Sequence, residues 1–528
     1  MSFIKFWAKL QGKASSKEGN LPGRDPSLAH IKSGWLFDPD ANQYDLLTVL
    51  TYLSCIASAN VSREQLFEAA ANLNYGPSPY FAQVANLVSS LGHDFTSACQ
   101  VVAETAPDET MRHFLLRFAN SLASGESETV FLERETHVQM EDYTNKYERD
   151  LESLRKWTDA FVALMVSANL VVLVALISNM IYALGSILIV TVEVVAIASA
   201  AMGAWLIYRI APFDPVVHKL KDRSPEQKLM SRLARILFPA ALLVALLAYF
   251  LFQSLGLAFI LAGILILPVG VVTLLLERKI DARDRDIADF LRSLGGVTAA
   301  RGSTVIASLG HIDRRAIGSL EPELKRLLAR IAIGVDTSRA WLRFMAETGS
   351  ELVHRVVRSF WDAVNLGGDP DTAGRLSADM ALRVSLLRTK RQLVSSTFNY
   401  VIVPMHIALA GTLVFMTEVV SAFNIKLVQA QAVVSSEHTT TINPEEIGIP
   451  NALTFQSFDT AFIKFMVLAV IISLTLVNAF APRAAAGGHS FKMALFGAFT
   501  LCATGAVLLL VPPMANSMFS DALSQPIS

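Results

Sequence analysis

Seven long apolar runs dominate the pattern of hydrophobic and polar positions along the chain. They lie at about 158–181, 185–208, 235–254, 257–276, 398–421, 461–481 and 493–513. A helix needs about twenty mostly apolar residues to cross the roughly 30 Å hydrocarbon core of a bilayer. Each run meets that length, so the pattern predicts an integral membrane protein with seven transmembrane helices.

The basic residues beside these runs predict how the chain is oriented. Lys and Arg gather in the connections after the second, fourth and sixth runs and before the fifth, whereas the alternate connections carry almost none. Because Lys and Arg accumulate on the cytoplasmic side, this predicts a multi-pass protein of the cytoplasmic membrane with its N-terminus inside and its C-terminus outside. The external segment 422–460 is then either a polar loop or a surface for an external partner.

Two polar segments, 44–157 and 278–397, have apolar residues at three- and four-residue spacing and are expected to be helical throughout. A shift of 242 positions aligns them without a gap over their best-matched part. The shared residues are Ala57 and Ala299, Gly92 and Gly334, Asp94 and Asp336, Ala98 and Ala340, Phe118 and Phe360, Gly125 and Gly367. The constant offset predicts a duplication, that is, two homologous helical-bundle domains in an all-α membrane protein. We call them the first unit and the second unit.

The predicted order of domains follows from these two patterns. Residues 1–43 form an N-terminal cytoplasmic segment, which opens with the amphipathic stretch MSFIKFWAKL, expected to be a helix at the inner leaflet or a disordered tail. The first unit is followed by four transmembrane helices in 158–277. The second unit is followed by three, in 398–528, with the external loop 422–460 between two of them.

The glycine and aspartate residues shared by the units fit helix ends better than a catalytic role. Glycine tolerates the left-handed conformation that ends many helices, which suits Gly92, Gly125, Gly334 and Gly367. Asp94 and Asp336 each follow such a glycine by two residues and can cap the next helix. We therefore predict that these six residues are domain caps.

The two units differ in charge. Residues 44–157 contain 8 Lys/Arg and 16 Asp/Glu, a net charge of −8, whereas residues 278–397 contain 20 and 14, a net charge of +6. We therefore expect the two units to face different partners or to face each other. Near Arg388 the excess of basic residues also suits cytoplasmic topology, and for those around Arg314 a protein contact is favoured over nucleic acid, because no aromatic interleaving accompanies them.

Composition agrees with a membrane protein and offers no catalytic site. The chain is 52% hydrophobic and 17% charged. Its three cysteines are far apart, its histidines show no metal spacing, and phosphate-loop, dinucleotide, GxSxG and HExxH motifs are absent from the sequence. We expect no enzyme activity, no cofactor and no metal site. Two ionisable residues inside the apolar runs, Glu193 and His406, are expected to make interhelical hydrogen bonds, with a proton or ion pathway as the alternative.

The duplicated helical units resemble the type II secretion system F-domain family. In the first unit, SLASGESETVFLERE resembles the family's turn of glycine and acidic residues followed by a long helix that enters the membrane. The resemblance covers about 40–420. The seven spans differ from the three that are usual in the bacterial GspF and PilC members. In plan the chain is closest to the archaellum and archaeal pilus platform proteins FlaJ and ArlJ, or to a fused TadB and TadC pair.

The resemblance implies a platform protein that couples a cytoplasmic hexameric ATPase to the insertion of pilin- or archaellin-like subunits into a filament. It also implies membrane lipids as partners and a homo-oligomer, a dimer or trimer. Within this expectation, the candidates for contact with the ATPase are basic residues of the second unit: Arg314, Arg315, Lys325, Arg326 and Arg330. The alternative function is a membrane transporter or permease with regulatory cytoplasmic domains, which would show polar groups at the membrane midplane and similarity between membrane halves.

Overall fold

The computed structural model describes residues 39–182, 186–312 apart from 219 and 221, 317–437 and 460–524. Over these residues the chain is almost entirely helical, and its only strand-like feature is an isolated bridge between Val217 and Ser350. The helices are α2 (Pro39–Ala57), α3 (Arg63–Ala71), α4 (Ser78–Leu91), α5 (Phe95–Thr105), α6 (Glu109–Ser124), α7 (Glu128–Tyr182), α8 (Ser186–Ile210), α9 (Pro225–Phe252), α10 (Leu255–Arg301), α11 (Val305–Leu309), η2 (Gly318–Leu320), α13 (Glu321–Ala332), α14 (Thr337–Thr348), α15 (Glu351–Asn365), α16 (Pro370–Glu437), α17 (Thr460–Ala486), η5 (Ser490–Lys492) and α18 (Met493–Ser524).

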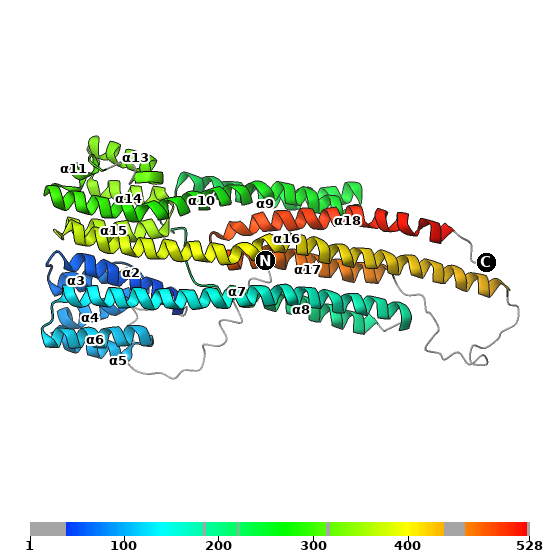
Figure 1. Cartoon of the computed structure of the whole chain (residues 1–528), viewed down its shortest axis with the longest axis horizontal. Coiled ribbons are helices and arrows are strands. Elements are labelled where there is room, and N and C mark those ends of the chain that lie inside the picture. The colour runs from blue at the N-terminus through cyan, green and yellow to red at the C-terminus, as the bar shows by residue number, and fades with distance from the viewer. Residues whose placement is uncertain are drawn as a thin grey trace.

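Seven of the described helices are long and apolar enough to cross a membrane, which confirms the predicted fold class. They are α7, α8, α9, α10, α16, α17 and α18. Figure 1 shows an elongated molecule with these spans side by side at one end and the short helices at the other. Three of the helices, α7, α10 and α16, run without a break from one end into the other.

Glycines let two of the spans approach closely. Gly256, Gly263 and Gly270 recur every seventh residue on α10 and face α18. A methyl group at Gly270 would lie 2.5 Å from Cα of Leu495, so no larger residue fits there without moving a backbone. Because lipid is as apolar as the helices, the hydrophobic effect does not drive helices together within the bilayer. Small residues at a crossing allow close van der Waals packing, which stabilises the contact instead.

The helices of the two units repeat at the offset found in the sequence. Helices begin at Arg63, Phe95, Glu109 and Glu128 in the first unit and at Val305, Thr337, Glu351 and Pro370 in the second, each 242 residues later. The role of α2 is taken in the second unit by the last part of α10, which continues from a membrane span. The two units therefore share a helical order.

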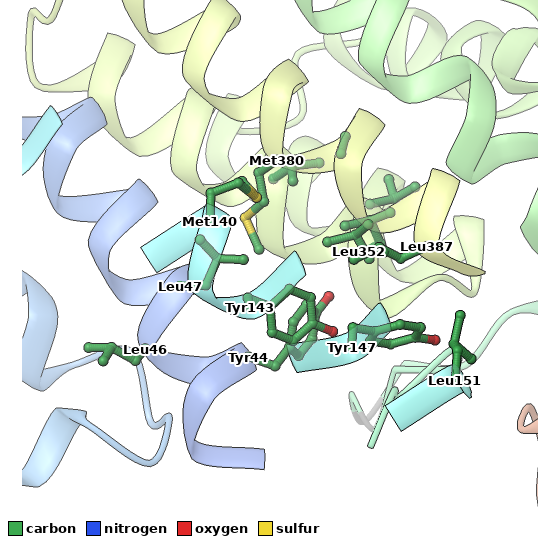
Figure 2. Packing of buried hydrophobic residues seen from close by; sticks show 14 of the residues in the cluster. Tyr44, Leu46, Leu47, Met140, Tyr143, Tyr147, Leu151, Leu352, Met380 and Leu387 are labelled. Carbon is green, nitrogen blue, oxygen red and sulfur yellow. The ribbon is translucent and has the colours of Figure 1, made fainter. Parts of the chain in front are cut away.

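The units pack against each other side by side. Helix α2 of the first unit lies against α15 and α16 of the second, whereas its counterpart α10 packs on the opposite side of those two helices (Figure 1). Apolar side chains fill part of the contact between the units: Met140 of α7 meets Met380 of α16, with Leu47 of α2 beside them (Figure 2). One unit thus presents its α2 side and the other its α15 side, so the contact joins different surfaces of the same fold.

One helix is longer than the apolar pattern predicts. The fifth run ends at about residue 421, but α16 continues to Glu437, into the segment 422–460 expected to form an external loop. Residues 422–437 contain no glycine or proline, so nothing in the local sequence stops the helix. Residues 438–459, and residues 1–38 with the amphipathic stretch, lie outside the described part of the chain.

Candidate functional site: the junction between the units and the spans

A network of buried charges lies where the second unit meets the membrane helices. Four segments converge there: α16, α10, the connection between α8 and α9, and the turn between α17 and α18. The connection runs alongside the second unit, since Glu351 N donates to the Val216 carbonyl at 3.0 Å and His218 Nε2 lies 2.8 Å from the Ala346 carbonyl. The network joins segments that are far apart in sequence.

Arg388 on α16 is the centre of this network. Its side chain is only 6% exposed and pairs with Asp214 of the α8–α9 connection at 2.7 Å. It also donates to the Pro215 carbonyl at 3.0 Å and pairs with Asp284 of α10, which in turn accepts a hydrogen bond from Ser350. A buried charge of this kind persists only when it is fully paired, so Arg388 holds three segments in one arrangement.

Burial raises the pKa of the Asp284 carboxyl, and the guanidinium of Arg388 opposes that rise, which leaves the pKa at about 6. Asp284 lies well beyond the apolar part of α10, on the side of the second unit. The carboxylate is therefore mostly ionised at neutral pH and gains a proton near pH 6, where the charge balance of the network changes.

Arg391, one helical turn after Arg388, binds backbone carbonyls. It donates to Pro212 at 2.7 Å, to Ala485 at 3.0 Å and to Ala484 at 3.1 Å. Two of these carbonyls belong to the C-terminal turn of α17, where the helix dipole favours a cation. The two arginines lie three residues apart on one face of α16 and so bind both the α8–α9 connection and the end of α17.

A second buried pair closes the junction around the turn before α18. Glu277 of α10 pairs with Lys492 at 2.7 Å and accepts a hydrogen bond from His489 N, also at 2.7 Å. A displacement of α16 or α10 at this level would therefore move the connections on either side of it. The arrangement suits transmission of movement; among the described residues no group of His, Cys, Asp and Glu could hold a metal ion.

The first unit does not repeat the two buried arginines of the junction. At the positions equivalent to Arg388 and Arg391 the first unit has Lys146, which is half-buried, and Arg149, which is exposed. The first unit is joined to its span by the uninterrupted helix α7. The second unit also continues into its spans through unbroken helices, α10 and α16, so the difference between the units at the membrane is the pair of buried arginines.

The residues expected to be domain caps all lie at helix ends. Gly92 and Gly125 end α4 and α6 in the left-handed conformation, with φ of 69° and 73°, and Gly334 and Gly367 have φ of 83° and 89°. Asp94 accepts a hydrogen bond from Ser97 N at 3.1 Å at the start of α5, and Asp336 accepts one from Arg339 N at 3.0 Å at the start of α14. This geometry needs no catalytic role for any of the six.

The basic residues expected to contact an ATPase are partly neutralised within the second unit. Lys325 pairs with Glu321 at 2.9 Å and Arg326 with Glu347 at 2.9 Å, and Arg330 also pairs with Glu347. Lys325 and Arg326 remain accessible, with side chains 72% and 45% exposed, whereas Arg330 is 16% exposed. Arg314 and Arg315 lie outside the described residues.

The two ionisable residues of the spans are both buried. His406 of α16 accepts a hydrogen bond from Asn478 Nδ2 of α17 at 3.1 Å and lies 2.8 Å from Thr504 Oγ1 of α18, so it joins three helices. Glu193 of α8 is 2% exposed, and its Oε1 makes no hydrogen bond to the described residues. The interhelical hydrogen bonds that the sequence led us to expect are thus seen at His406 and not at that oxygen of Glu193.

Two curated proteins named Flagella accessory protein J are similar to this chain. The one from Methanocaldococcus jannaschii is 25% identical over 474 residues, which are 87% of this chain and 79% of the relative. The one from Methanococcus voltae is 22% identical over 453 residues, which are 83% and 78%. This chain is related to Flagella accessory protein J. No family model and no solved structure matches it.

This relationship confirms the resemblance drawn from the duplicated units, and it extends beyond them to the spans. Sequence reasoning nevertheless missed the junction. In the sequence, Arg388 and Arg391 indicate only cytoplasmic topology, and no pattern singles out Asp214 or Asp284. The available clue was the three-residue spacing of two arginines on a helix about to enter the membrane, which places both on one face.

Proposed function

We propose that this chain is the membrane platform protein of an archaellum-type filament assembly machine. The similarity to Flagella accessory protein J, over more than four fifths of the chain in both relatives, carries the proposal. The fold supports it, since seven membrane helices joined to two helical units suit a protein that anchors a machine and receives force. The units then lie in the cytoplasm, as the basic connections predict.

In this proposal a cytoplasmic hexameric ATPase binds the helical units and moves them. Helices α7 and α16 carry that movement into the bilayer, because each is unbroken from unit to span. At the junction, Arg388 and Arg391 pass the movement of α16 to the α8–α9 connection and to α17. The resulting shift among the spans would lift pilin- or archaellin-like subunits from the bilayer into the filament.

The surface proposed to bind the ATPase is the basic face of the second unit, with Lys325 and Arg326 as its most exposed described members. Because Lys325 and Arg326 pair with Glu321 and Glu347, replacing either basic residue with glutamate would place two glutamates side by side. Neutral substitutions avoid that repulsion. The double variant Lys325→Gln with Arg326→Gln removes both positive charges without adding a negative one. The matched control is Lys156→Gln on α7, which removes one exposed charge from the first unit.

The full-length protein, in detergent, is used to capture the assembly ATPase encoded beside it. We expect the double variant to retain clearly less ATPase than the parent and the control to retain as much, with all three eluting as a single species. Equal capture by the double variant would remove this face from the proposal. Cells that lack the protein and still assemble filaments would contradict the proposed function itself.

A further inference from the structure

Two ion pairs between the units join residues that occupy the same position in each. Glu133 of α7 pairs with Arg375 of α16 at 3.0 Å, and Glu148 pairs with Lys390. In each pair the two residues are 242 positions apart in the sequence, which is the offset of the duplication. Because two such contacts occur at different levels of the same two helices, α7 and α16 run side by side in the same direction, as Figure 1 shows.

A third ion pair between the units has the same polarity. Arg355 of α15 pairs with Asp45 of α2 at 2.7 Å, and its guanidinium lies 4.3 Å from the ring centres of both Tyr44 and Tyr75. In each of the three pairs the first unit supplies the acid and the second unit supplies the base. The opposite net charges of the units are therefore used, at least at these positions, in the contact between them.

We propose that the charges at these equivalent positions determine which unit pairs with which. Two first units packed through α7 in the same way would place Glu133 against Glu133 and Glu148 against Glu148. Two second units would place Arg375 against Arg375 and Lys390 against Lys390. Like charges directly opposite each other repel, whereas a first unit packed against a second unit gains two ion pairs. The contact between unlike units is therefore favoured over a contact between two like units.

The surface of the first unit along α7 is thus specific for a second unit, and the preferred one is in the same chain. The four spans that join the two units in the chain keep them close together. This favours the contact between units of one chain over contact with a unit of another copy. The sequence leaves open whether the opposite charges serve different partners or the contact between the units, and these three ion pairs belong to that contact. The proposed pairing concerns the assembly of the chain itself and does not depend on the proposed function.

The test measures contact between the units by cross-linking in the full-length protein. Glu148→Cys and Lys390→Cys are introduced together as the reporter, joined by a short bismaleimide, and the cross-linked peptide is quantified by mass spectrometry. The protein with only its native cysteines gives the background; Cys55 and Cys99 are buried and Cys502 is half-buried. The remaining equivalent pair, Glu133 with Arg375, is then varied in the reporter.

We expect Glu133→Arg, which faces Arg375, and Arg375→Glu, which faces Glu133, each to slow the intramolecular cross-link about two- to fivefold, the range for partly exposed ion pairs. Glu133→Arg combined with Arg375→Glu restores opposite charges and should return the rate to that of the parent reporter. The matched control, Glu152→Arg on the exposed side of α7, should leave the rate unchanged.

Single variants that cross-link as fast as the control, or a swapped double variant as slow as the single ones, would overturn the proposal. A second measurement uses two tagged chains, one with Glu148→Cys and the other with Lys390→Cys, expressed together. We expect cross-linked dimers only at the background level. Dimers formed as readily as the intramolecular product would show that the second unit is supplied by another copy, which contradicts the assignment.

Discussion

The same helix crossing is built from leucines in the first unit and from glycines in the second. Leu53 of α2 and Leu132 of α7 are both fully buried, and the residues 242 positions later are Gly295 of α10 and Gly374 of α16. A methyl group at Gly374 would lie 2.9 Å from the Leu291 carbonyl oxygen. The fold of the unit is therefore compatible with two distances between these helices.

A second comparison concerns α6 and α15, which also occupy equivalent positions. Helix α15 is buried around most of its circumference because α2 of the other unit covers the side that α6 leaves to solvent. His113 of α6 is exposed, and its counterpart Arg355 is 5% exposed between two tyrosines. Neighbours from the other unit, rather than the local fold, decide what each helix must bury.

The largest expected effect is at Arg355. Replacement with alanine should lower the stability of the protein by about 3–5 kcal/mol, because Asp45 and Glu351 lose a buried partner. His113→Ala in α6 should change stability by less than about 0.5 kcal/mol, as for other surface substitutions. Thermal unfolding of the purified proteins measures both, and similar losses would contradict the difference between the two helices.

Two adjacent glycines of α10 should respond in opposite directions. Gly295→Ala places a methyl group 3.1 Å from Cα of Gly374 and closer still to the Pro370 carbonyl, and should cost about 1–3 kcal/mol. Gly296→Ala meets only Asp371 Oδ1 at 3.7 Å and should stabilise the helix by up to about 1 kcal/mol. The melting temperatures of the two variants test whether α10 and α16 approach closely at Gly295. Equal shifts in the two melting temperatures would contradict that close approach.

Acid should destabilise the second unit through His354 of α15. Burial lowers the pKa of His354 from its usual 6.5 to about 3, so the folded protein holds this residue neutral. The stabilising effect is complete above pH 6.5 and is lost as the pH falls towards 3, by up to about 1.4 kcal/mol per pH unit. The counterpart of His354 in the first unit is Arg112. In His354→Gln the melting temperature should fall less steeply between pH 7 and pH 5 than in the parent. Equal slopes would show that His354 does not cause the loss of stability in acid.

The smallest difference is expected at the caps, where the units are alike. Gly92→Ala and Gly334→Ala each force a side chain into the left-handed conformation, and nothing lies within 4 Å of either added methyl group. We expect each to cost about 1 kcal/mol, through backbone strain alone. Unequal losses in thermal unfolding would mean that the two turns differ in a way the shared geometry does not reveal.

How much of this the sequence could predict depends on how far apart the partners are. The spans and the helix ends follow from local patterns, since apolar length and a glycine before an aspartate act within a few residues. The partners of Arg388 at the junction lie 174 and 104 residues away, and no periodicity links them. Likewise the sequence showed opposite charge on the two units but could not show that Glu133 meets Arg375. Of the predicted ATPase-contact residues, Lys325 pairs with Glu321 within one helical turn, a spacing visible in the sequence, whereas the partner of Arg326, Glu347, belongs to the next helix and could not be predicted.

Amide hydrogen exchange of the full-length protein in detergent tests the central claim most directly, since it reports how strongly each helix is held. Two copies of one fold differ because α2 covers α15, whereas no described helix of the second unit covers α6 in the same way. Peptides from Glu351–Asn365 should then exchange at least about tenfold more slowly than peptides from Glu109–Ser124. Equal protection of the two helices, or faster exchange in α15, would contradict the account.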